Sequence, residues 1–167
     1  MNKIIVIGCP GAGKTHFAKK LGERLHIQVH HLDTYFWKEN RTEMNEVEFL
    51  KIQNELMEKD QWIIDGNFTK SMEHRMSKAD TIIFLDYPKR IVLWRFLKRY
   101  FKFFNKVRPE MGGNNKEVLQ WSFIKFILKY PTGKVYEKIE RHSKGKNVVV
   151  LHNPKETAQF LKNQTIS

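Results

Sequence analysis

Short apolar runs alternate with amphipathic segments along the chain. The runs contain four to eight residues rich in Ile, Val, Leu or aromatic side chains, which is typical of buried strands. They lie at residues 4–7, 26–32, 62–68, 79–86 and 146–151. Because helical segments separate consecutive runs, the pattern predicts an α/β fold with a parallel, doubly wound sheet.

The segments between the runs carry apolar residues at helical spacing. We expect helices over residues 14–25, 43–59, 69–78, 89–104, 117–129, 135–141 and 155–162. The segment 89–104 is two-sided, with basic residues on one face and an apolar stripe on another. We expect this stripe in the core; it comprises Leu93, Phe96, Leu97, Tyr100, Phe101 and Phe104. Residues 105–116 include a proline, paired glycines and asparagines, which is typical of a loop.

The glycine-rich segment after the first run has the spacing of a phosphate-binding loop, with Gly, four residues, then Gly-Lys-Thr. Backbone N–H groups of such a loop point at phosphate oxygens, and the following helix adds its positive N-terminal end. Lys14 can reach the β- and γ-phosphates, and the Thr15 hydroxyl can bind Mg²⁺. The expected ATP-binding residues are Gly8, Cys9, Pro10, Gly11, Ala12, Gly13, Lys14 and Thr15.

The length of 167 residues, without internal repeats or low-complexity linkers, predicts one domain over residues 1–167. No apolar run approaches the ~20 residues that a membrane span requires. Cys9 is the single cysteine, so no internal disulfide can form, which favours a cytoplasmic protein. The nearby helix end could lower the pKa of the Cys9 thiol, so a redox-sensitive role and a simple packing role both stay open.

Positive charge is concentrated in one part of the chain. The formal net charge is +12, and residues 89–146 contain 16 Lys and Arg against 4 Asp and Glu. Such a segment could bind a polyanion such as nucleic acid. It could equally form the cationic lid of a phosphoryl-transfer enzyme. The charge pattern leaves both interpretations open.

Two acidic residues follow the ends of predicted strands, where open parallel sheets bind ligands. Asp33 could accept the proton of an attacking hydroxyl, or it could cap the helix that follows. Trp37 could form a wall of the acceptor pocket or pack on the sheet. Asp65 could hold Mg²⁺ directly or through water, or it could belong to a strand-end turn. The following Gly66-Asn67 provides backbone room for a substrate.

Three histidines, His26, His30 and His31, lie near the second run. No Cys or Glu stands at zinc-ligand spacing beside them. In an alternating strand, His30 and His31 point to opposite faces. The pattern therefore does not favour a metal site at these histidines.

Arginines provide candidate contacts to the migrating phosphoryl group. Arg95 and Arg99 are four residues apart, so both project from one side of the predicted helix. Together they could stabilise the charge of the transferred group, or they could belong to a solvated basic face. Arg108 lies in the predicted loop and would act as a lid arginine.

The phosphate loop, with its internal Pro10-Gly11-Ala12-Gly13, resembles that of the adenylate-kinase-like P-loop kinases. Within them, the chain resembles the bacterial DNA topology modulation proteins (FlaR-related). The likeness rests on His31-Leu32-Asp33 with Trp37, Trp62-Ile63-Ile64-Asp65-Gly66-Asn67-Phe68, Leu85-Asp86-Tyr87-Pro88, Trp94-Arg95 through Arg99, and Arg108-Pro109-Glu110-Met111. The resemblance implies a three-layer P-loop NTPase fold, with a five-stranded parallel sheet in the order 2-3-1-4-5 and a mobile lid after the fourth strand.

The same resemblance implies roles for individual residues. Asp65 matches the acid that nucleotide kinases place near Mg²⁺, and Arg95 and Arg99 match the arginine pair at the start of their lid. Asn153 and Pro154, after His152, would lie where these enzymes hold adenine. The chain departs from nucleotide kinases after Asp65-Gly66, where Asn67-Phe68 replaces their arginine. This departure favours a hydroxyl-bearing metabolite or nucleoside as acceptor over a nucleoside monophosphate.

The combined prediction is a cytoplasmic, Mg-ATP-dependent kinase for a small-molecule acceptor. Its catalytic residues would be Lys14, Asp33, Arg95, Arg99 and Arg108. Its substrate-binding region would cover about residues 34–60, and its basic lid about residues 95–130. The alternative is an ATP-binding, DNA-associated factor that modulates DNA topology through its basic 89–146 segment. The sequence leaves open the identity of the acceptor and the oligomeric state.

Overall fold

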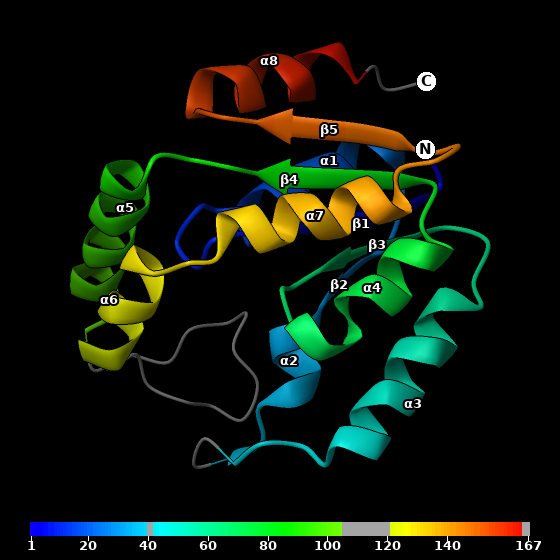
Figure 1. Cartoon of the computed structure of the whole chain (residues 1–167), viewed down its shortest axis with the longest axis horizontal. Helices are drawn as coiled ribbons and strands as arrows, with labels where there is room; N and C mark the ends of the chain where they lie inside the picture. Colours follow the sequence, from blue (N-terminus) through cyan, green and yellow to red (C-terminus); the bar gives the residue numbers. More distant parts are fainter. Residues whose placement is uncertain (40–41, 105–120, 165–167) are drawn as a thin grey trace.

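The computed structural model describes residues 1–39, 42–104 and 121–164. Its centre is a parallel sheet in the order β2-β3-β1-β4-β5, as predicted (Figure 1). The strands are β1 (Lys3–Gly8), β2 (Val29–His31), β3 (Trp62–Asp65), β4 (Thr81–Leu85) and β5 (Asn147–Leu151). All four strand pairings are parallel, so every carboxyl end lies at the same edge of the sheet.

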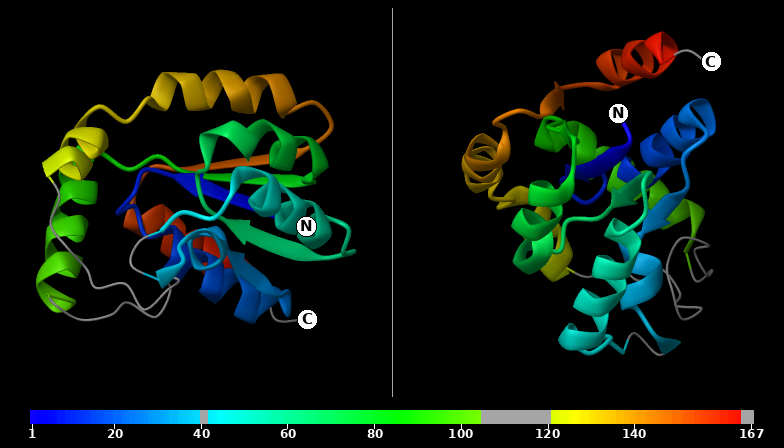
Figure 2. Two further views of the ribbon diagram at one scale, coloured as in Figure 1. Left: turned by 90° about the horizontal axis from the view of Figure 1, so that it is seen from below. Right: turned by 90° about the vertical axis from the view of Figure 1, so that its right-hand side faces the viewer.

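Helices cover both faces of this sheet and complete a three-layer fold. They are α1 (Lys14–Leu25), α2 (Leu32–Phe36), α3 (Glu46–Met57), α4 (Thr69–Lys78), α5 (Lys89–Lys102), α6 (Trp121–Leu128), α7 (Thr132–His142) and α8 (Pro154–Asn163). Figure 2 shows α1 and α8 on one face, and α4 and α7 on the other. The helices α5 and α6 stand beside the carboxyl ends of the strands, so they face the region where the phosphate loop begins.

The hydrophobic core follows from burial of the central strands on both faces. Ile4, Ile5, Val6 and Ile7 of β1 have no exposed surface. The apolar residues of β3 and β4 are similarly buried, which explains why these strands are continuous apolar runs. The edge strand β5 is half-buried over Val148–Val150. This rigid centre fixes the positions of the loops at its carboxyl edge.

Two elements differ from the prediction. The run 26–32 contributes only Val29–His31 to the sheet, because the chain turns into α2 at Leu32. In α5, Phe96 is buried, but Phe101 is 73% exposed and Phe104, just beyond the helix, is 61% exposed. The expected core stripe is therefore only partly buried, because the end of α5 extends past the sheet. The expected loop 105–116 and the start of the helix predicted over 117–129 lie outside the described residues.

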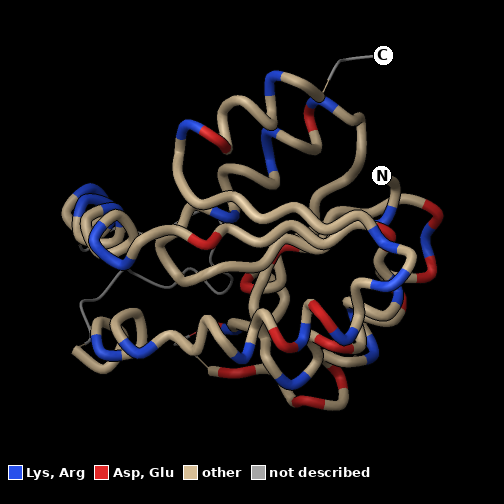
Figure 3. Tube along the Cα trace, turned by 45° about the horizontal axis from the view of Figure 1, so that its top comes forward, with Lys and Arg blue, Asp and Glu red and all other residues tan. Residues whose placement is uncertain are grey.

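Basic side chains gather on α5, beside the carboxyl edge of the sheet. Helix α5 contains six Lys and Arg and no acidic residue. Figure 3 shows these cations at one end of the molecule, while acidic residues are more frequent at the other end. Among the helices of the described part, none has the length and apolar character that crossing a membrane would demand.

Candidate active site

The phosphate loop connects β1 to α1 at the carboxyl edge of the sheet. Gly11 and Gly13 adopt positive φ values of 92° and 95°, which favour glycine. A Cβ atom at Gly11 would lie 3.0 Å from the Val92 carbonyl oxygen, and one at Gly13 would lie 3.0 Å from Nη1 of Arg95. The glycines therefore allow both the curved backbone and the close approach of α5.

Lys14 is the first residue of α1, and its ammonium lies over the loop. Nζ donates hydrogen bonds to the carbonyl oxygens of Gly8 at 2.9 Å and of Cys9 at 3.4 Å. Burial lowers the pKa of Lys14, while the carboxylates of Asp65 and Asp33 act in the opposite direction. Both predicted acids therefore act electrostatically on the cation of the loop.

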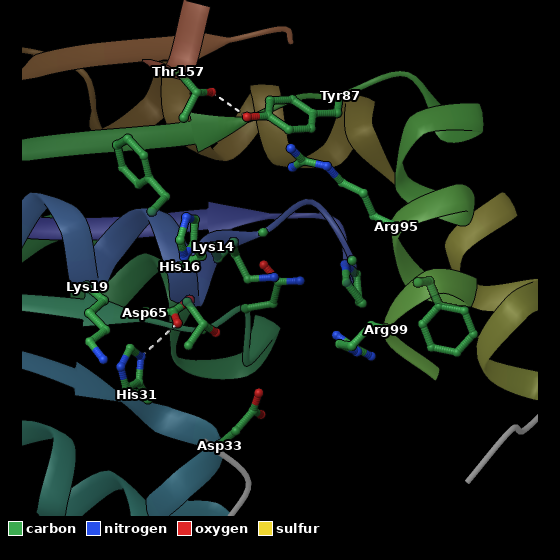
Figure 4. Close-up of a pocket in the computed structure, with 18 of the residues that line it drawn as sticks. Lys14, His16, Lys19, His31, Asp33, Asp65, Tyr87, Arg95, Arg99 and Thr157 are labelled. Atoms are coloured by element: carbon green, nitrogen blue, oxygen red, sulfur yellow. Dashed lines mark hydrogen bonds and ion pairs between the residues drawn. The ribbon is translucent and has the colours of Figure 1, made fainter. Parts of the chain in front are cut away.

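The loop and the neighbouring strand ends enclose a cavity of about 1620 Å³ (Figure 4). Its lining includes most of the residues that the sequence predicts for the site. These are Pro10, Gly11, Gly13, Lys14, Thr15, Asp33, Trp37, Asp65, Gly66, Asn67, Arg95, Arg99 and Pro154. Residues from five separate parts of the chain thus converge on one cavity.

The two acids reach this cavity in different ways. Asp65 is the last residue of β3, and its carboxylate Oδ2 lies 3.0 Å from Nδ1 of His31. Asp33 projects from α2 into the cavity (Figure 4). The N-cap position of α2 is occupied by His31, so Asp33 lies in the first turn rather than at the cap. The capping role considered for Asp33 is therefore wrong.

Helix α5 supplies the two predicted arginines. Arg95 donates from Nη1 to the Ala12 carbonyl oxygen at 2.8 Å, and its guanidinium lies 5.1 Å from the centre of the Tyr87 ring. The Tyr87 hydroxyl in turn hydrogen-bonds the Thr157 hydroxyl of α8. The Arg99 guanidinium lies 5.3 Å from the Phe96 ring centre, and its charge lowers the pKa of Lys14. Both arginines point from α5 towards the loop (Figure 4).

Arg75 is a buried residue of this region that no sequence pattern indicates. Its side chain has no exposed surface. It donates to the carbonyl oxygens of Gly66 at 2.8 Å, Asn67 at 2.6 Å and Phe68 at 3.1 Å. Burial lowers the pKa of Arg75, and the charge of Asp65 opposes this effect. The guanidinium therefore holds together the turn that follows β3.

The same turn is connected to the phosphate loop. Asn67 Oδ1 accepts hydrogen bonds from the Gly8 backbone N–H at 3.2 Å and from the Tyr130 hydroxyl at 3.5 Å. Phe68 has a positive φ of 32°, which is unusual for an aromatic residue. The position of the Asn67 side chain thus depends on a strained turn that Arg75 stabilises.

The remaining predicted residues take other positions. The Asn153 side chain caps α8 by accepting from the backbone N–H groups of Lys155 and Glu156, and only the adjacent Pro154 lines the cavity. Cys9 is buried, and burial raises the pKa of its thiol to about 11. The expectation that a helix end could lower this pKa is therefore wrong. Arg108 lies outside the described residues.

The donor atoms of the site suit Mg²⁺ that arrives with a nucleotide. Thr15 and Asp65 offer a hydroxyl and a carboxylate, which are the hard oxygen ligands that Mg²⁺ prefers. Across the described ranges, no three His, Cys, Asp or Glu side chains cluster as a metal cage. Mg²⁺ commonly binds through one or two protein oxygens together with substrate phosphates and water. The residues present fit this mode of binding.

A comparison with known protein families identifies the family of the chain. The model of the AAA domain family matches residues 4–102, which is more than half of the chain and includes β1, the phosphate loop and α5. The chain belongs to the AAA domain family. In this AAA domain protein the matched region also contains Asp33, Asp65 and both arginines. No protein of curated function matches the sequence.

Two solved structures are similar to this AAA domain protein over nearly the whole chain. The shikimate kinase from Acinetobacter baumannii, in complex with shikimate, aligns with a TM-score of 0.57 and 15% identity over 98% of this chain and 90% of the other. The shikimate kinase from Bacteroides thetaiotaomicron aligns with a TM-score of 0.54 and 17% identity over 96% and 94%. The chain therefore has the P-loop fold of these kinases over nearly its whole length.

Proposed function

We propose that this protein is a cytoplasmic kinase that transfers the γ-phosphoryl group of Mg-ATP to a hydroxyl group of a small acceptor. One observation carries the proposal: the ammonium of Lys14, the carboxylate of Asp33 and the guanidinium of Arg99 line the same cavity. A phosphate-binding cation, a proton acceptor and a second cation are the groups that phosphoryl transfer to a hydroxyl requires.

The proposed reaction assigns one task to each group. Backbone N–H groups of Gly11, Gly13 and Lys14 bind the phosphates, and Thr15 and Asp65 would hold the Mg²⁺, which neutralises phosphate charge when bound. The acceptor hydroxyl gives its proton to Asp33 as its oxygen bonds to the γ-phosphorus. The bond from that phosphorus to the β–γ bridging oxygen breaks, and ADP leaves. Cationic side chains stabilise the charge on the transferred group.

The arginines have separate places in this proposal. Arg95 uses its Nη1 donor on the Ala12 carbonyl oxygen of the loop, whereas Arg99 points towards the loop in Figure 4 and its charge lowers the pKa of Lys14. Arg99 is therefore the better candidate for contact with the migrating phosphoryl group. Arg95 supports the loop and would contact the nucleotide. Participation of Arg108 remains a prediction.

The acceptor side of the cavity favours a hydroxyl-bearing metabolite or nucleoside. The residues after Asp65-Gly66 are Asn67 and Phe68, and the buried Arg75 uses its donors on backbone carbonyls. Arg75 therefore does not replace the acceptor-binding arginine of nucleotide kinases. We also propose that the chain belongs to the DNA topology modulation (FlaR-related) group of P-loop kinases.

Activity with an acceptor panel tests this function. The purified protein is incubated with Mg-ATP and nucleosides, nucleoside monophosphates, sugars and shikimate, and products are followed by mass spectrometry. Asp33→Asn should retain ATP binding and lose most turnover, whereas Lys14→Ala should lose phosphoryl transfer. Asp60→Asn, at an exposed carboxylate outside the cavity, is the matched control. Unchanged turnover in Lys14→Ala would contradict the proposal.

A second candidate function is an ATP-binding, DNA-associated factor. It is favoured by α5, which carries six basic and no acidic residues together with exposed Trp94 and Phe101. Charge-driven DNA binding should weaken steeply with salt, because neutralised phosphates release counterions. Binding that persists at high salt would contradict this mode. ATP hydrolysis that responds to DNA, without transfer to any acceptor, would favour this function over the kinase.

A further inference from the structure

The His31 side chain lines the cavity but has no role in the function proposed above. His31 ends β2, Asp65 ends β3, and the two residues are register partners in the parallel pairing of these strands. Partners in register project to the same side of a sheet, so the two side chains meet at its carboxyl edge. The Nδ1–Oδ2 distance of 3.0 Å is that of a good hydrogen bond.

The chemistry of the pair defines where the proton lies. An ionised carboxylate only accepts hydrogen bonds, so Nδ1 of His31 must donate. The Asp65 side chain is 5% exposed, and the His31 side chain is 22% exposed. The imidazole therefore holds a nearly buried carboxylate from the side that faces the cavity rim. Figure 4 shows this bond at the cavity that Lys14 also lines.

The bond restricts the orientation of the Asp65 carboxylate. Oδ2 is occupied by His31, and no hydrogen-bond donor to Oδ1 is found within residues 1–39, 42–104 and 121–164. Rotation of the carboxyl group would break its bond to the imidazole. The pair therefore keeps one oxygen on the imidazole and leaves the other for a ligand.

We propose that His31 is a positioning residue that orients Asp65 towards the Mg²⁺ of the nucleotide. This inference rests on the proposed Mg-ATP site. Removal of a hydrogen bond to a metal-binding carboxylate typically weakens metal affinity by about 10- to 100-fold. His31 would thus act through Asp65, without contact to the phosphoryl group.

The neighbouring histidine provides a contrast. His30 points to the other side of β2, where its Nδ1 lies 3.0 Å from the Tyr35 hydroxyl. Burial lowers the pKa of His30 to about 4. His30 does not line the cavity. Because successive side chains of β2 point to opposite faces, His30 packs in the core whereas His31 lines the cavity.

Substitutions that remove or keep the hydrogen-bond donor test the inference. His31→Leu removes the donor, whereas the amide of His31→Asn can place an N–H group near the position of Nδ1. His74→Leu, on the exposed face of α4, is the control for the first substitution. His26→Asn is the control for the second, because His26 has a φ of 55° and Asn tolerates this conformation.

The measurement is binding of a fluorescent ATP analogue at increasing Mg²⁺ concentration, with thermal unfolding to confirm that each variant is folded. His31→Leu should need at least about 10-fold more Mg²⁺ for half-maximal enhancement of binding. Its affinity without metal should stay within about 2-fold of the wild type, the scatter expected when no contact is lost. His31→Asn should recover most of the metal response. Both controls should match the wild type.

Two results would overturn the inference. One is an unchanged Mg²⁺ response in His31→Leu, and the other is an equal loss of metal-free binding in both His31 variants. If His31→Leu does not fold, side-chain ¹⁵N NMR of the wild type decides, because an unprotonated Nδ1 excludes the proposed bond. Failure of the kinase proposal is separate: the wild type would then bind Mg-ATP without phosphorylating any acceptor.

Discussion

Replacement of Arg75 by methionine tests whether the turn after β3 depends on the buried guanidinium. The substitution keeps an unbranched side chain but removes donors to the carbonyl oxygens of Gly66, Asn67 and Phe68. A buried polar group that loses its partner costs about 1–3 kcal/mol. The Gly66 carbonyl bond is buried and the other two are partly buried, so we expect a total loss of about 3 kcal/mol.

Urea unfolding followed by tryptophan fluorescence measures this loss through the shift of the midpoint at constant slope. Arg141→Met is the matched control, because Arg141 forms an exposed ion pair with Glu73 at 2.7 Å. Exposed pairs contribute about 0–1 kcal/mol, so this control should stay close to the wild type. Equal stability losses in the two variants would refute the assigned role of Arg75.

Arg75→Met should also weaken ATP binding, because Asn67 would no longer be held against the Gly8 N–H group. Arg75→Lys distinguishes charge from geometry. A lysine keeps the positive charge but lacks the planar fork that reaches several carbonyls at once. We expect its stability to lie between those of the wild type and of Arg75→Met. A lysine variant as stable as the wild type would show that charge alone is sufficient.

Two further predictions concern the loop and the core. Gly13→Ala should lose about 1–2 kcal/mol of stability in urea unfolding and bind ATP more weakly in calorimetry, because φ is 95° and the new Cβ would meet Arg95 at 3.0 Å. Gly133→Ala, whose Cβ would meet no atom within 4 Å, should retain both properties. His30 has its pKa lowered by burial to about 4, against about 6.5 when unfolded. As the pH falls, His30 is therefore protonated in the unfolded state before it is protonated in the folded state. The free energy of unfolding should fall by up to about 3 kcal/mol between pH 6.5 and 4. A pH series of urea unfolding should show a smaller fall for His30→Phe, and an equal fall would contradict the assignment.

The strands and their parallel arrangement could be predicted because their signals in the sequence are local, whereas the strand order was expected from the family resemblance. Continuous apolar runs such as Ile4–Ile7 indicate strands that are buried on both faces, and the glycine spacing before Lys14 indicates a phosphate-binding loop. The common edge of parallel strands then brings Asp33 and Asp65 together without any knowledge of distant packing. The position of the candidate site could be predicted for the same reason, because its residues follow the ends of these strands.

Features that depend on distant contacts could not be predicted. Arg75 looks like one more charged residue of a short helix, and only the direction of three carbonyl groups shows why it is buried. Phe101 has the spacing of a core residue, yet it extends beyond the sheet that would cover it. The bond between Tyr87 and Thr157 joins residues that are 70 positions apart. Local periodicity carries no information about such pairs.

The buried thiol of Cys9 provides a natural probe for movement of α6. Its Sγ lies 3.9 Å from the carbonyl oxygen of Ile127, and α6 also supplies Phe123 and Phe126 to the cavity lining. With a pKa of about 11, the thiol is largely uncharged at neutral pH and reacts slowly with alkylating agents. Because α6 covers this thiol, we expect alkylation to be faster when α6 moves away from the phosphate loop. The labelling rate of this natural cysteine would therefore report on movement of α6 beside the cavity, without any introduced probe.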